Sequence, residues 1–591
     1  MSELITGQNR TARCAEFDET YVGKKVTAMG WVAVRRDMGS IIFVDLRDRT
    51  GLVQIVIDYK NVKEDFEKAS HIKNEYVISV EGEVVKRSEA TINPKLKTGT
   101  IEIIASSIRV LSECDVLPFA IEENSTVSEQ TRMKYRYLDL RRPDMQRNLM
   151  IKNKIANITR NFFYDEGFIE VETPMLTRST PEGARDYLVP SRVNPGTFYA
   201  LPQSPQLFKQ ILMLAGYDRY IQIARCFRDE DLRADRQPEF TQIDMEMSFA
   251  SEEDLFAIVE DCMHEVFKEL KGIELEKFPR IKYLDAMEKY GSDKPDLRFE
   301  MLQHNVTELF RNSEFSVFKS NLENNGVIKA IKVDNHSFSR KETDKFSEFV
   351  KIYKAKGVAF VKYENNDFTG GIAKFLSDDE KNALRNEFSL SENDTLLFVA
   401  DKKSIADVAL GALRCKVAKE LGLIDENKFC FAWIVEFPMY EWSDDRQRYE
   451  AASNPFSCPR DEDIAKLEDD KGNCFSRAYD LVLNGYELSS GAIRIHDQDV
   501  QAKVFKALGL SEEQAKERFG FFLDAFQYGM PPECGCGIGL ERLIMILCGT
   551  DNIKDVVAFP KTATAYDLMA DAPGNVDQEQ LDALDLIVKE K

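Results

Sequence analysis

The 591-residue chain, with 43% apolar and 30% charged residues, has the composition of an ordinary globular protein and is long enough for about three or four domains. It has no signal peptide, no apolar run near the roughly 20 residues that span a bilayer, and eleven scattered cysteines without a Cys-x-x-Cys pair, so we expect a cytoplasmic protein with reduced thiols and no membrane contact. The net charge of −22 excludes a uniformly basic nucleic-acid-binding protein, and any such contact would have to rest on local patches.

Residues 1–112 carry a series of short β-patterned segments separated by turn residues. The clearest are 26–32, 41–46 and 51–57. About five such strands in about 100 residues fit a small barrel of the oligonucleotide-binding type (OB-fold), although a sandwich fits the same pattern. Aromatic, guanidinium and amide groups suit contacts with single-stranded bases, while core packing is the alternative for the aromatic ring. The candidates are Arg35, Arg36, Phe43 and Gln54.

A basic hinge, residues 113–142, follows the strands. Between Arg132 and Arg160 there are nine Lys or Arg residues and two acids, nine minus two giving a local balance of +7. Such a segment fits either a solvated hinge or a contact with phosphates, and its place between two domains favours phosphate contact.

An amphipathic helix and a strand come next. Ile151, Ile155, Ile158 and Phe162 are spaced by 4, 3 and 4 residues, which predicts one apolar helix face ending before a glycine. The following strand is expected to contain Pro174, which fits an edge position because no ladder hydrogen bond is needed there.

The segment after the first of two arginine loops has two distinct faces when it is read as a strand. The face expected in the core holds Ile243, Met245, Met247 and Phe249. The face expected to form an active-site floor holds Phe240, Gln242, Asp244 and Glu246. On that floor the aromatic ring could stack on adenine, and the first carboxylate could hold an ammonium group.

The two arginine loops are the strongest chemical signal. The first is Phe-Arg-Asp-Glu at 227–230 with Gln-Pro-Glu-Phe at 237–240, and the second is Gly-Cys-Gly-Ile-Gly-Leu-Glu-Arg at 535–542. A guanidinium binds phosphate oxygens in a planar, two-pronged geometry, and glycines let a ligand approach closely. The pair therefore predicts a bent nucleotide held between them. A dinucleotide fingerprint fails at Leu540, and no Walker loop is present.

Two further cations, Lys209 and Arg494, predict an acidic substrate. Leaving such a charge buried and unpaired costs on the order of 3–5 kcal/mol, which would favour a carboxylate over an amide by several hundredfold. Glu487 lies seven residues before Arg494, so a regular strand would place the two on opposite faces. If both line one pocket, a β-bulge is expected at 489–491.

Together these features resemble the class II aminoacyl-tRNA synthetases, and over almost the whole chain the bacterial-type aspartyl-tRNA synthetases. The resemblance is carried by the arginine loops and by residues 35–37, 135–142, 167–175, 180–187 and 291–298. It implies an α+β multidomain fold with an antiparallel-sheet catalytic domain and an inserted α+β domain. The implied divisions are an OB-fold anticodon-binding domain at 1–112, the hinge at 113–142, catalytic parts at 143–298 and 426–591, the second with a C-terminal extension, and the insertion at 299–425.

The resemblance implies an ATP-dependent, AMP-forming ligase that works as a homodimer. The enzyme would convert L-aspartate and ATP into aspartyl-adenylate and pyrophosphate, and then transfer aspartate to the 3′ end of tRNA(Asp). Whether tRNA(Asn) is charged as well stays open.

The resemblance also implies a role for individual residues, position by position. The implied aspartate-binding residues are Glu182, on a loop that closes over the substrate, with Ser204, Gln206, Lys209, Asp244, Ser453 and Arg494. The implied ATP-binding residues are Arg228, Asp229, Glu230, Gln237, Phe240, Glu487, Gly539, Leu540, Glu541 and Arg542, and of these Arg228, Arg542 and Glu487 are the catalytic ones. The implied magnesium ligands are Asp480 and Glu487, which are hard oxygen donors.

Ser453 departs from the family, which usually has a histidine at this position. A serine hydroxyl offers a neutral hydrogen bond, so we expect weaker and less pH-dependent aspartate binding.

Three alternatives are weighed against this interpretation. An asparaginyl or lysyl enzyme is disfavoured by Lys209 together with Arg494. An ammonia-dependent asparagine synthetase would have no use for the N-terminal barrel. A non-catalytic nucleic-acid-binding relative would be expected to have lost Arg228, Asp480, Glu487 or Arg542, and all four are present.

Overall fold

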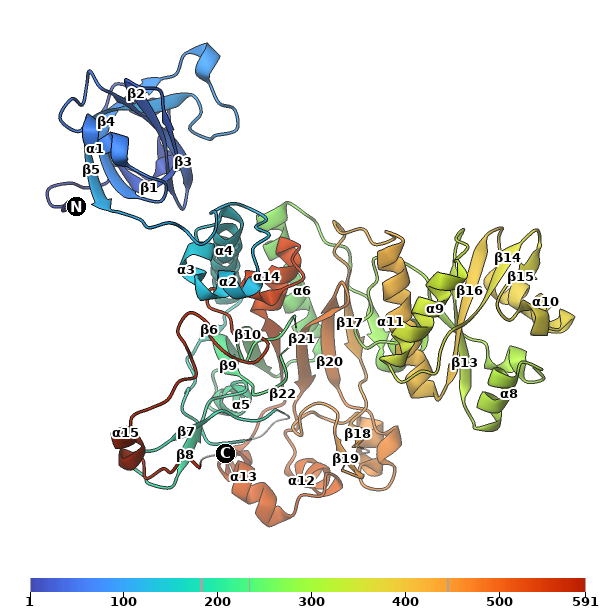
Figure 1. Cartoon of the computed structure of the whole chain (residues 1–591). Helices are drawn as coiled ribbons and strands as arrows, with labels where there is room; N and C mark the ends of the chain where they lie inside the picture. The colour runs from blue at the N-terminus through green and yellow to red at the C-terminus, as the bar shows by residue number, and fades with distance from the viewer. Residues whose placement is uncertain (1, 181–183, 233, 444–445, 590–591) are drawn as a thin grey trace. The chain divides into compact units, whose positions relative to one another are not determined.

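The computed structural model describes residues 2–180, 184–232, 234–443 and 446–589 (Figure 1). The chain forms two compact units, residues 1–147 and 148–591. Among the helices of the described ranges, none is long and apolar enough to cross a membrane.

The first unit contains a closed five-stranded barrel. Its strands follow the order β1 (Lys25–Asp37), β2 (Ile41–Asp48), β3 (Gly51–Asp58), β5 (Ile101–Ser112) and β4 (Val77–Lys86). Alternate residues of β2, namely Ile42, Val44 and Leu46, are buried in the barrel core with their counterparts from the other strands. Closure of the sheet confirms the barrel and excludes the sandwich that the pattern also allowed.

Helices α2 (Glu129–Lys134) and α3 (Arg136–Asp139) form within the basic hinge. Arg136 and Arg142 are buried there, and both pair with the carboxylate of Asp139, at 2.5 and 2.8 Å. With Arg132 at 3.7 Å, three of the nine cations pair with this carboxylate, so the surface that can meet phosphates is less basic than the sequence count suggests.

The second unit is built on an eight-stranded sheet, antiparallel except at its two edges. The order is β11 (Arg280–Lys282), β17 (Phe431–Val435), β20 (Ala478–Leu483), β21 (Tyr486–Ile493), β22 (Glu533–Gly539), β10 (Glu239–Ser248), β9 (Arg219–Phe227) and β6 (Ile169–Glu170). One face packs against α4 (Pro143–Asp165), α6 (Glu252–Lys271) and α14 (Leu540–Cys548). The predicted helix is confirmed within α4, where Ile155 is fully buried and the other three apolar residues pack around the core.

Two details of the sequence interpretation were wrong. Phe249 lies beyond the end of β10 with φ of +56°, so the chain turns and its ring is 76% exposed; Ile243, Met245 and Met247 do lie in the core. Pro174 lies in irregular chain, since β6 ends at Glu170, although β6 itself is the edge strand that was expected.

A second sheet of five strands lies between the two halves of the catalytic sheet in sequence. Its order is β12 (Gln303–Asn305), β13 (Val327–Val333), β16 (Asp394–Asp401), β14 (Ala359–Glu364) and β15 (Asp367–Thr369). Strand β16 is buried on both faces: Leu396 and Phe398 pack toward α8 (Ser316–Glu323) and α10 (Asp378–Phe388), whereas Leu397 and Val399 pack toward α9 (Arg340–Lys351) and α11 (Lys403–Glu420). This arrangement is the α+β layer structure expected for the insertion.

Other helices and hairpins of the second unit lie outside these two sheets. They are α5 (Gln206–Leu214), α7 (Tyr283–Tyr290), α12 (Gln498–Ala507), α13 (Glu512–Ala525), α15 (Gln578–Ala583) and the hairpins β7–β8 (Leu188–Pro190, Phe198–Ala200) and β18–β19 (Tyr440–Ser443, Arg448–Ala451). Phe456 lies at the centre of an aromatic cluster that joins α12 to α13, with Phe505, Phe519 and Phe522 around it.

Candidate active site

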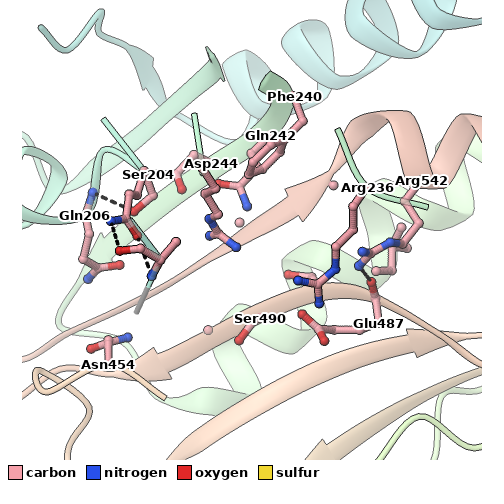
Figure 2. Close-up of a pocket in the computed structure, with 18 of the residues that line it drawn as sticks. Ser204, Gln206, Arg236, Phe240, Gln242, Asp244, Asn454, Glu487, Ser490 and Arg542 are labelled. Carbon is pink, nitrogen blue, oxygen red and sulfur yellow. Dashed lines mark hydrogen bonds between the residues drawn. The ribbon is translucent and has the colours of Figure 1, made fainter. Parts of the chain in front are cut away.

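A cavity of about 400 Å³ opens on the face of the large sheet that the core helices leave free. Its lining comes from β10, β21, β22, the helix α5 and the two arginine loops. Figure 2 shows its two ends: Arg236, Arg542 and Glu487 gather at one, and Ser204, Gln206 and Asn454 at the other. The alternation predicted for β10 is confirmed here, because Phe240, Gln242 and Asp244 line the cavity while Ile243, Met245 and Met247 are in the core. Glu246, the fourth residue predicted for the floor, is fully buried and is not among the lining residues.

The two predicted arginines meet at one end. The first loop is closed by the Arg228 N–H, which donates to the carbonyl oxygen of Pro238 at 2.8 Å, and the guanidinium lies over the ring of Phe240 at 5.2 Å. Arg542, in the first turn of α14, donates to the carbonyl oxygen of Glu487 and pairs with Asp235 at 3.2 Å. A flat base and a charged phosphate chain could be held side by side here, which is the arrangement that a bent nucleotide needs.

Several predicted ATP contacts have side chains that are already committed elsewhere. Leu540 is buried in the core behind the sheet, so only its backbone could reach a ligand. The Gln237 amide binds the backbone of Lys561 at 2.7 and 3.2 Å, and Glu541 accepts hydrogen bonds from Lys152 and from the N–H of Thr241.

The acidic residues of the first loop differ in position. Glu230 lines the cavity and pairs with Arg236 at 2.8 Å. Asp229 lies outside the lining and is 3.7 Å from Arg185. Of the two, Glu230 is the one placed to meet a bound nucleotide.

A buried cluster of charges occupies the other end of the cavity. The Lys209 ammonium lies 3.0 Å from Asp244 and 3.1 Å from Glu246, and the Arg494 guanidinium lies 2.8 Å from Glu246. All four side chains are at most 2% exposed. The expectation of two unpaired cations was therefore wrong, because strand β10 supplies a carboxylate to each of them.

Burial raises the pKa of Asp244 to about 6, although the nearby Lys209 ammonium opposes the shift. Glu533, which sequence reasoning missed, lies behind the same cluster. Its two carboxylate oxygens have no hydrogen-bond partner among the described residues, and burial together with Glu246 raises its pKa well above the usual range. A neutral Glu533 leaves the cluster with two cations and two anions.

The alternate glycines of β22 leave the space that these carboxylates fill. In the β10–β22 register Gly535 lies opposite Glu246 and Gly537 opposite Asp244. A Cβ atom on Gly535 would lie 1.8 Å from the carboxylate of Glu246, and one on Gly537 would lie 3.2 Å from that of Asp244. The close approach predicted from the glycine spacing is thus needed by the protein's own side chains.

The predicted β-bulge is present, but one residue earlier than expected. Leu481 pairs with Ser489 and Val482 with Glu487, so Leu488 has no partner on β20. This extra residue changes the alternation, and Glu487 and Arg494 both line the cavity.

The remaining substrate candidates lie around the charge cluster. Ser204 and Gln206 line the cavity at the start of α5, and the side-chain nitrogen of Gln206 is buried without a partner in the part of the chain that is described. Ser453 lines the mouth beside Asn454 and is exposed. Glu182 lies outside the described residues.

Two comparisons decide the family. The model described as "tRNA synthetases class II (D, K and N)" matches residues 128–563, and the "OB-fold nucleic acid binding domain" model matches residues 26–111. An aspartate–tRNA ligase from Bacillus licheniformis is 53% identical over 586 residues, with 98% of this chain and 99% of the relative covered. The chain belongs to the aspartate–tRNA ligase family of class II synthetases. It is an aminoacyl-tRNA synthetase, and ATP is one of its substrates.

Other relatives have related names. An aspartate–tRNA(Asp/Asn) ligase of Geobacillus sp. is 52% identical, with 98% of each chain covered. The fold also matches the asparaginyl-tRNA synthetase of Pyrococcus horikoshii complexed with asparaginyl-adenylate, with a TM-score of 0.58, 19% identity and coverage of 94% and 98%. At that identity the likeness to the solved structure shows the fold alone.

The synthetase also brings together most of its candidate tRNA-binding residues on the barrel. Phe43 is half-buried on the outer face, so core packing is excluded for it, and Arg36 is its cross-strand partner. Arg36 donates to Gln54 at 3.2 Å and to Asp45 at 3.0 Å. Arg35 pairs across the strands with the buried Val44, so it points to the opposite side of β1.

Further lining residues of the synthetase's site escaped the sequence analysis. They are Asp235, Arg236, Asn454, Ser489 and Ser490. Arg236 could have been predicted from the sequence, because it directly precedes Gln237 in the first arginine loop. The two serines could have been found only by placing the bulge at Leu488.

Proposed function

We propose that this member of the aspartate–tRNA ligase family activates L-aspartate with ATP and transfers it to tRNA(Asp), with residue roles set by the two ends of the cavity. The observation that carries the proposal is the buried cluster of Lys209, Asp244, Glu246 and Arg494 beside a nucleotide-sized end lined by two arginines. A zwitterion with a second carboxylate finds a group of opposite charge there for its ammonium and for its side chain.

In this proposal the substrate makes two complementary contacts. Its α-ammonium binds Asp244, and its side-chain carboxylate takes a share of Lys209 and Arg494, which now bind Glu246. Because Glu246 already pairs with both cations, an amide in place of the substrate carboxylate would leave neither cation unpaired, but its single carbonyl oxygen would lose the charge-assisted hydrogen bonds that a carboxylate accepts from Lys209 and Arg494. In this proposal, selection for aspartate depends on its side-chain carboxylate replacing part of the Glu246 contact with Lys209 and Arg494, and not on cations that are unpaired before binding.

The first step is attack by the α-carboxylate of aspartate on the α-phosphorus of ATP, which breaks the bond to pyrophosphate and forms aspartyl-adenylate. A carboxylate is already a nucleophile at neutral pH, so the step needs no general base. The protein contributes alignment and neutralisation of charge on the phosphates, through Arg228 and Arg542. In the second step a ribose hydroxyl at the 3′ end of the tRNA attacks the activated carbonyl and AMP leaves.

Asp480 and Glu487 fit a magnesium ion that arrives with ATP. They are hard oxygen donors on adjacent strands, and burial together with the charge of Glu487 raises the pKa of Asp480 well above its usual range. In the described ranges no three or more His, Cys, Asp or Glu side chains form a metal cluster, so phosphate oxygens would supply further ligands. The ion would screen the negative charge of the phosphates.

We extend the proposal to the assembly and the setting of the enzyme. Ile169, Met175 and Leu176, on and after the edge strand β6, are exposed apolar side chains and support a homodimer formed along this edge. All eleven cysteines are free thiols, which supports the cytoplasm. On the barrel, Arg36, Phe43 and Gln54 are the residues we propose for the anticodon.

Two measurements test the function. ATP–pyrophosphate exchange should depend on aspartate and be several hundredfold slower with asparagine; equal rates would refute the proposed pocket. Charging of purified tRNA(Asn) tests breadth, because the relatives include enzymes named for tRNA(Asp/Asn). Efficient charging of that tRNA would select the broader activity.

A further inference from the structure

One helix of the insertion contacts a segment that borders the active site. The segment, residues 288–301, leaves the end of α7 and runs to the start of the insertion, and we call it the link. Helix α11 of the insertion meets it along one stripe formed by Asp407, Gly411 and Arg414, which are spaced by four and three residues and so share a helix face.

Arg414 is devoted to holding the shape of the link. The residue is 1% exposed, and its guanidinium donates to four backbone carbonyl oxygens at 2.9–3.0 Å and lies 3.9 Å from the centre of the Phe299 ring. The accepting carbonyls belong to Asp296, Phe299, Glu300 and Met301. By binding these carbonyl oxygens, Arg414 fixes the backbone of a part of the link that belongs to no strand or helix.

The contact between helix and link is also made backbone against backbone. A Cβ atom on Gly411 would lie 2.5 Å from the carbonyl oxygen of Tyr290, and one on Gly291 would lie 2.0 Å from that of Asp407. The buried Lys329 of β13 adds hydrogen bonds of 2.7 Å to both the Glu288 carbonyl and the Asp407 carboxylate. The start of the link therefore has almost no freedom to shift relative to α11.

At its centre the link presents a cation to the catalytic sheet. The Lys294 ammonium lies 3.0 Å from the carboxylate of Glu487 and 3.0 Å from that of Asp293. Both contacts are ion pairs at hydrogen-bonding distance, so the ammonium is held between the two carboxylates. Next to it, Asp296 packs against Gly485 in the turn that joins β20 to β21.

We propose that Lys294 is a positioning residue for the nucleotide end of the site, and that the insertion helix α11 sets its place through Arg414. Lys294 holds the Glu487 carboxylate in the orientation required by ATP and its cation. The inference rests on the proposed role of Glu487, and it assigns the insertion a part in activation although the insertion contributes no lining residue to the cavity.

The first test compares Lys294→Met with Lys289→Met, an exposed lysine on α7 that serves as the matched control. Lys294→Met should weaken equilibrium binding of Mg·ATP, measured by calorimetry, and raise the KM for ATP by about tenfold, the scale of one lost charge-assisted hydrogen bond. The KM for aspartate should stay within about twofold, and Lys294→Arg should restore most of the loss. Unchanged ATP binding in Lys294→Met overturns the proposal.

The second test asks whether Arg414 acts through Lys294. Arg414→Lys should weaken ATP binding in the wild-type background and add little in the Lys294→Met background, a non-additive cycle. Additive effects, or a lower melting temperature with normal ATP binding, overturn the role assigned to α11. Aspartate-dependent ATP–pyrophosphate exchange in the wild-type enzyme keeps the two proposals apart. If the wild-type enzyme shows no such exchange, the proposed function is wrong. If the wild-type enzyme shows normal exchange and Lys294→Met binds ATP like the wild type, only this inference is wrong.

Discussion

At the scale of single residues, the substrate end of the site is a closed network of charges rather than a receptive positive pocket. Sequence patterns identified Lys209 and Arg494 as the cations and Asp244 as an ammonium partner. They did not reveal that Glu246 pairs with both cations, because such a contact joins residues 37 and 248 positions apart and depends on strand pairing. The sequence did not indicate Glu533 either, because its position beside the cluster also depends on how the strands pair.

Aspartate affinity should fall as the pH drops below about 6. The pKa of Asp244 is raised to about 6, so this carboxyl gains a proton below that value and loses the charge that attracts the substrate ammonium. Calorimetric titration of aspartate between pH 5 and pH 8, values chosen about this pKa, should show the loss, and Asp244→Asn should bind weakly at every pH. A flat profile in the wild-type enzyme would contradict this role of Asp244.

The same titration changes how Ser453 must be tested. A transition near the histidine range in the wild-type enzyme is attributable to Asp244, so it does not bear on the missing histidine. Ser453→His should add a second transition and strengthen binding when the imidazole is charged. If Ser453→His leaves both affinity and pH profile unchanged, the position does not contact aspartate.

At the scale of elements, strand alternation predicted more than motif matching did. The two faces of β10 and the need for a bulge before Arg494 followed from parity alone. The position of the bulge did not follow from parity, because an extra residue at 488 or at any of the next few positions would bring Glu487 and Arg494 to the same face. Phe249 was misplaced because the pattern continues past Ser248, whereas the backbone turns there.

Gly535→Ala should destabilise the catalytic unit. The added methyl group would lie 1.8 Å from the Glu246 carboxylate and 2.3 Å from the carbonyl oxygen of Met245, both of which are fixed within the sheet. Overpacking of this kind costs about 1–3 kcal/mol, which urea unfolding followed by tryptophan fluorescence would detect. Gly520→Ala on α13, where the nearest atom is a flexible lysine carbon at 3.5 Å, is the control. Equal stability of the two variants would show that β22 yields to the methyl group.

At the scale of the whole molecule, the order of motifs was enough to predict a barrel followed by a class II catalytic sheet with an α+β insertion. The sequence could not predict how the insertion meets the link beside the site, because α11 has no chemical motif and contacts the link largely through backbone atoms. The basic hinge was overestimated for a related reason, since Asp139 neutralises cations that a composition count treats as exposed.

The division of labour between the units predicts separable defects. Phe43→Ala should raise the KM for tRNA by about tenfold or more, since stacking of a base on an aromatic ring contributes about 1–3 kcal/mol, and should leave ATP–pyrophosphate exchange unchanged. The exposed barrel residue Ile92, changed to Ala, is the control. A parallel loss of exchange in Phe43→Ala would mean that the barrel serves activation and not only tRNA binding.

The central claim is that an acidic amino acid and ATP react in one cavity whose fixed cations include Arg228 and Arg494. Rapid-quench measurement of aspartyl-adenylate formation in a single turnover, without tRNA, tests it most directly. The rate should fall by about a hundredfold or more in both Arg228→Ala and Arg494→Ala, as expected for losing a preorganised positive group. Adenylate formation at the wild-type rate in either variant would contradict the account.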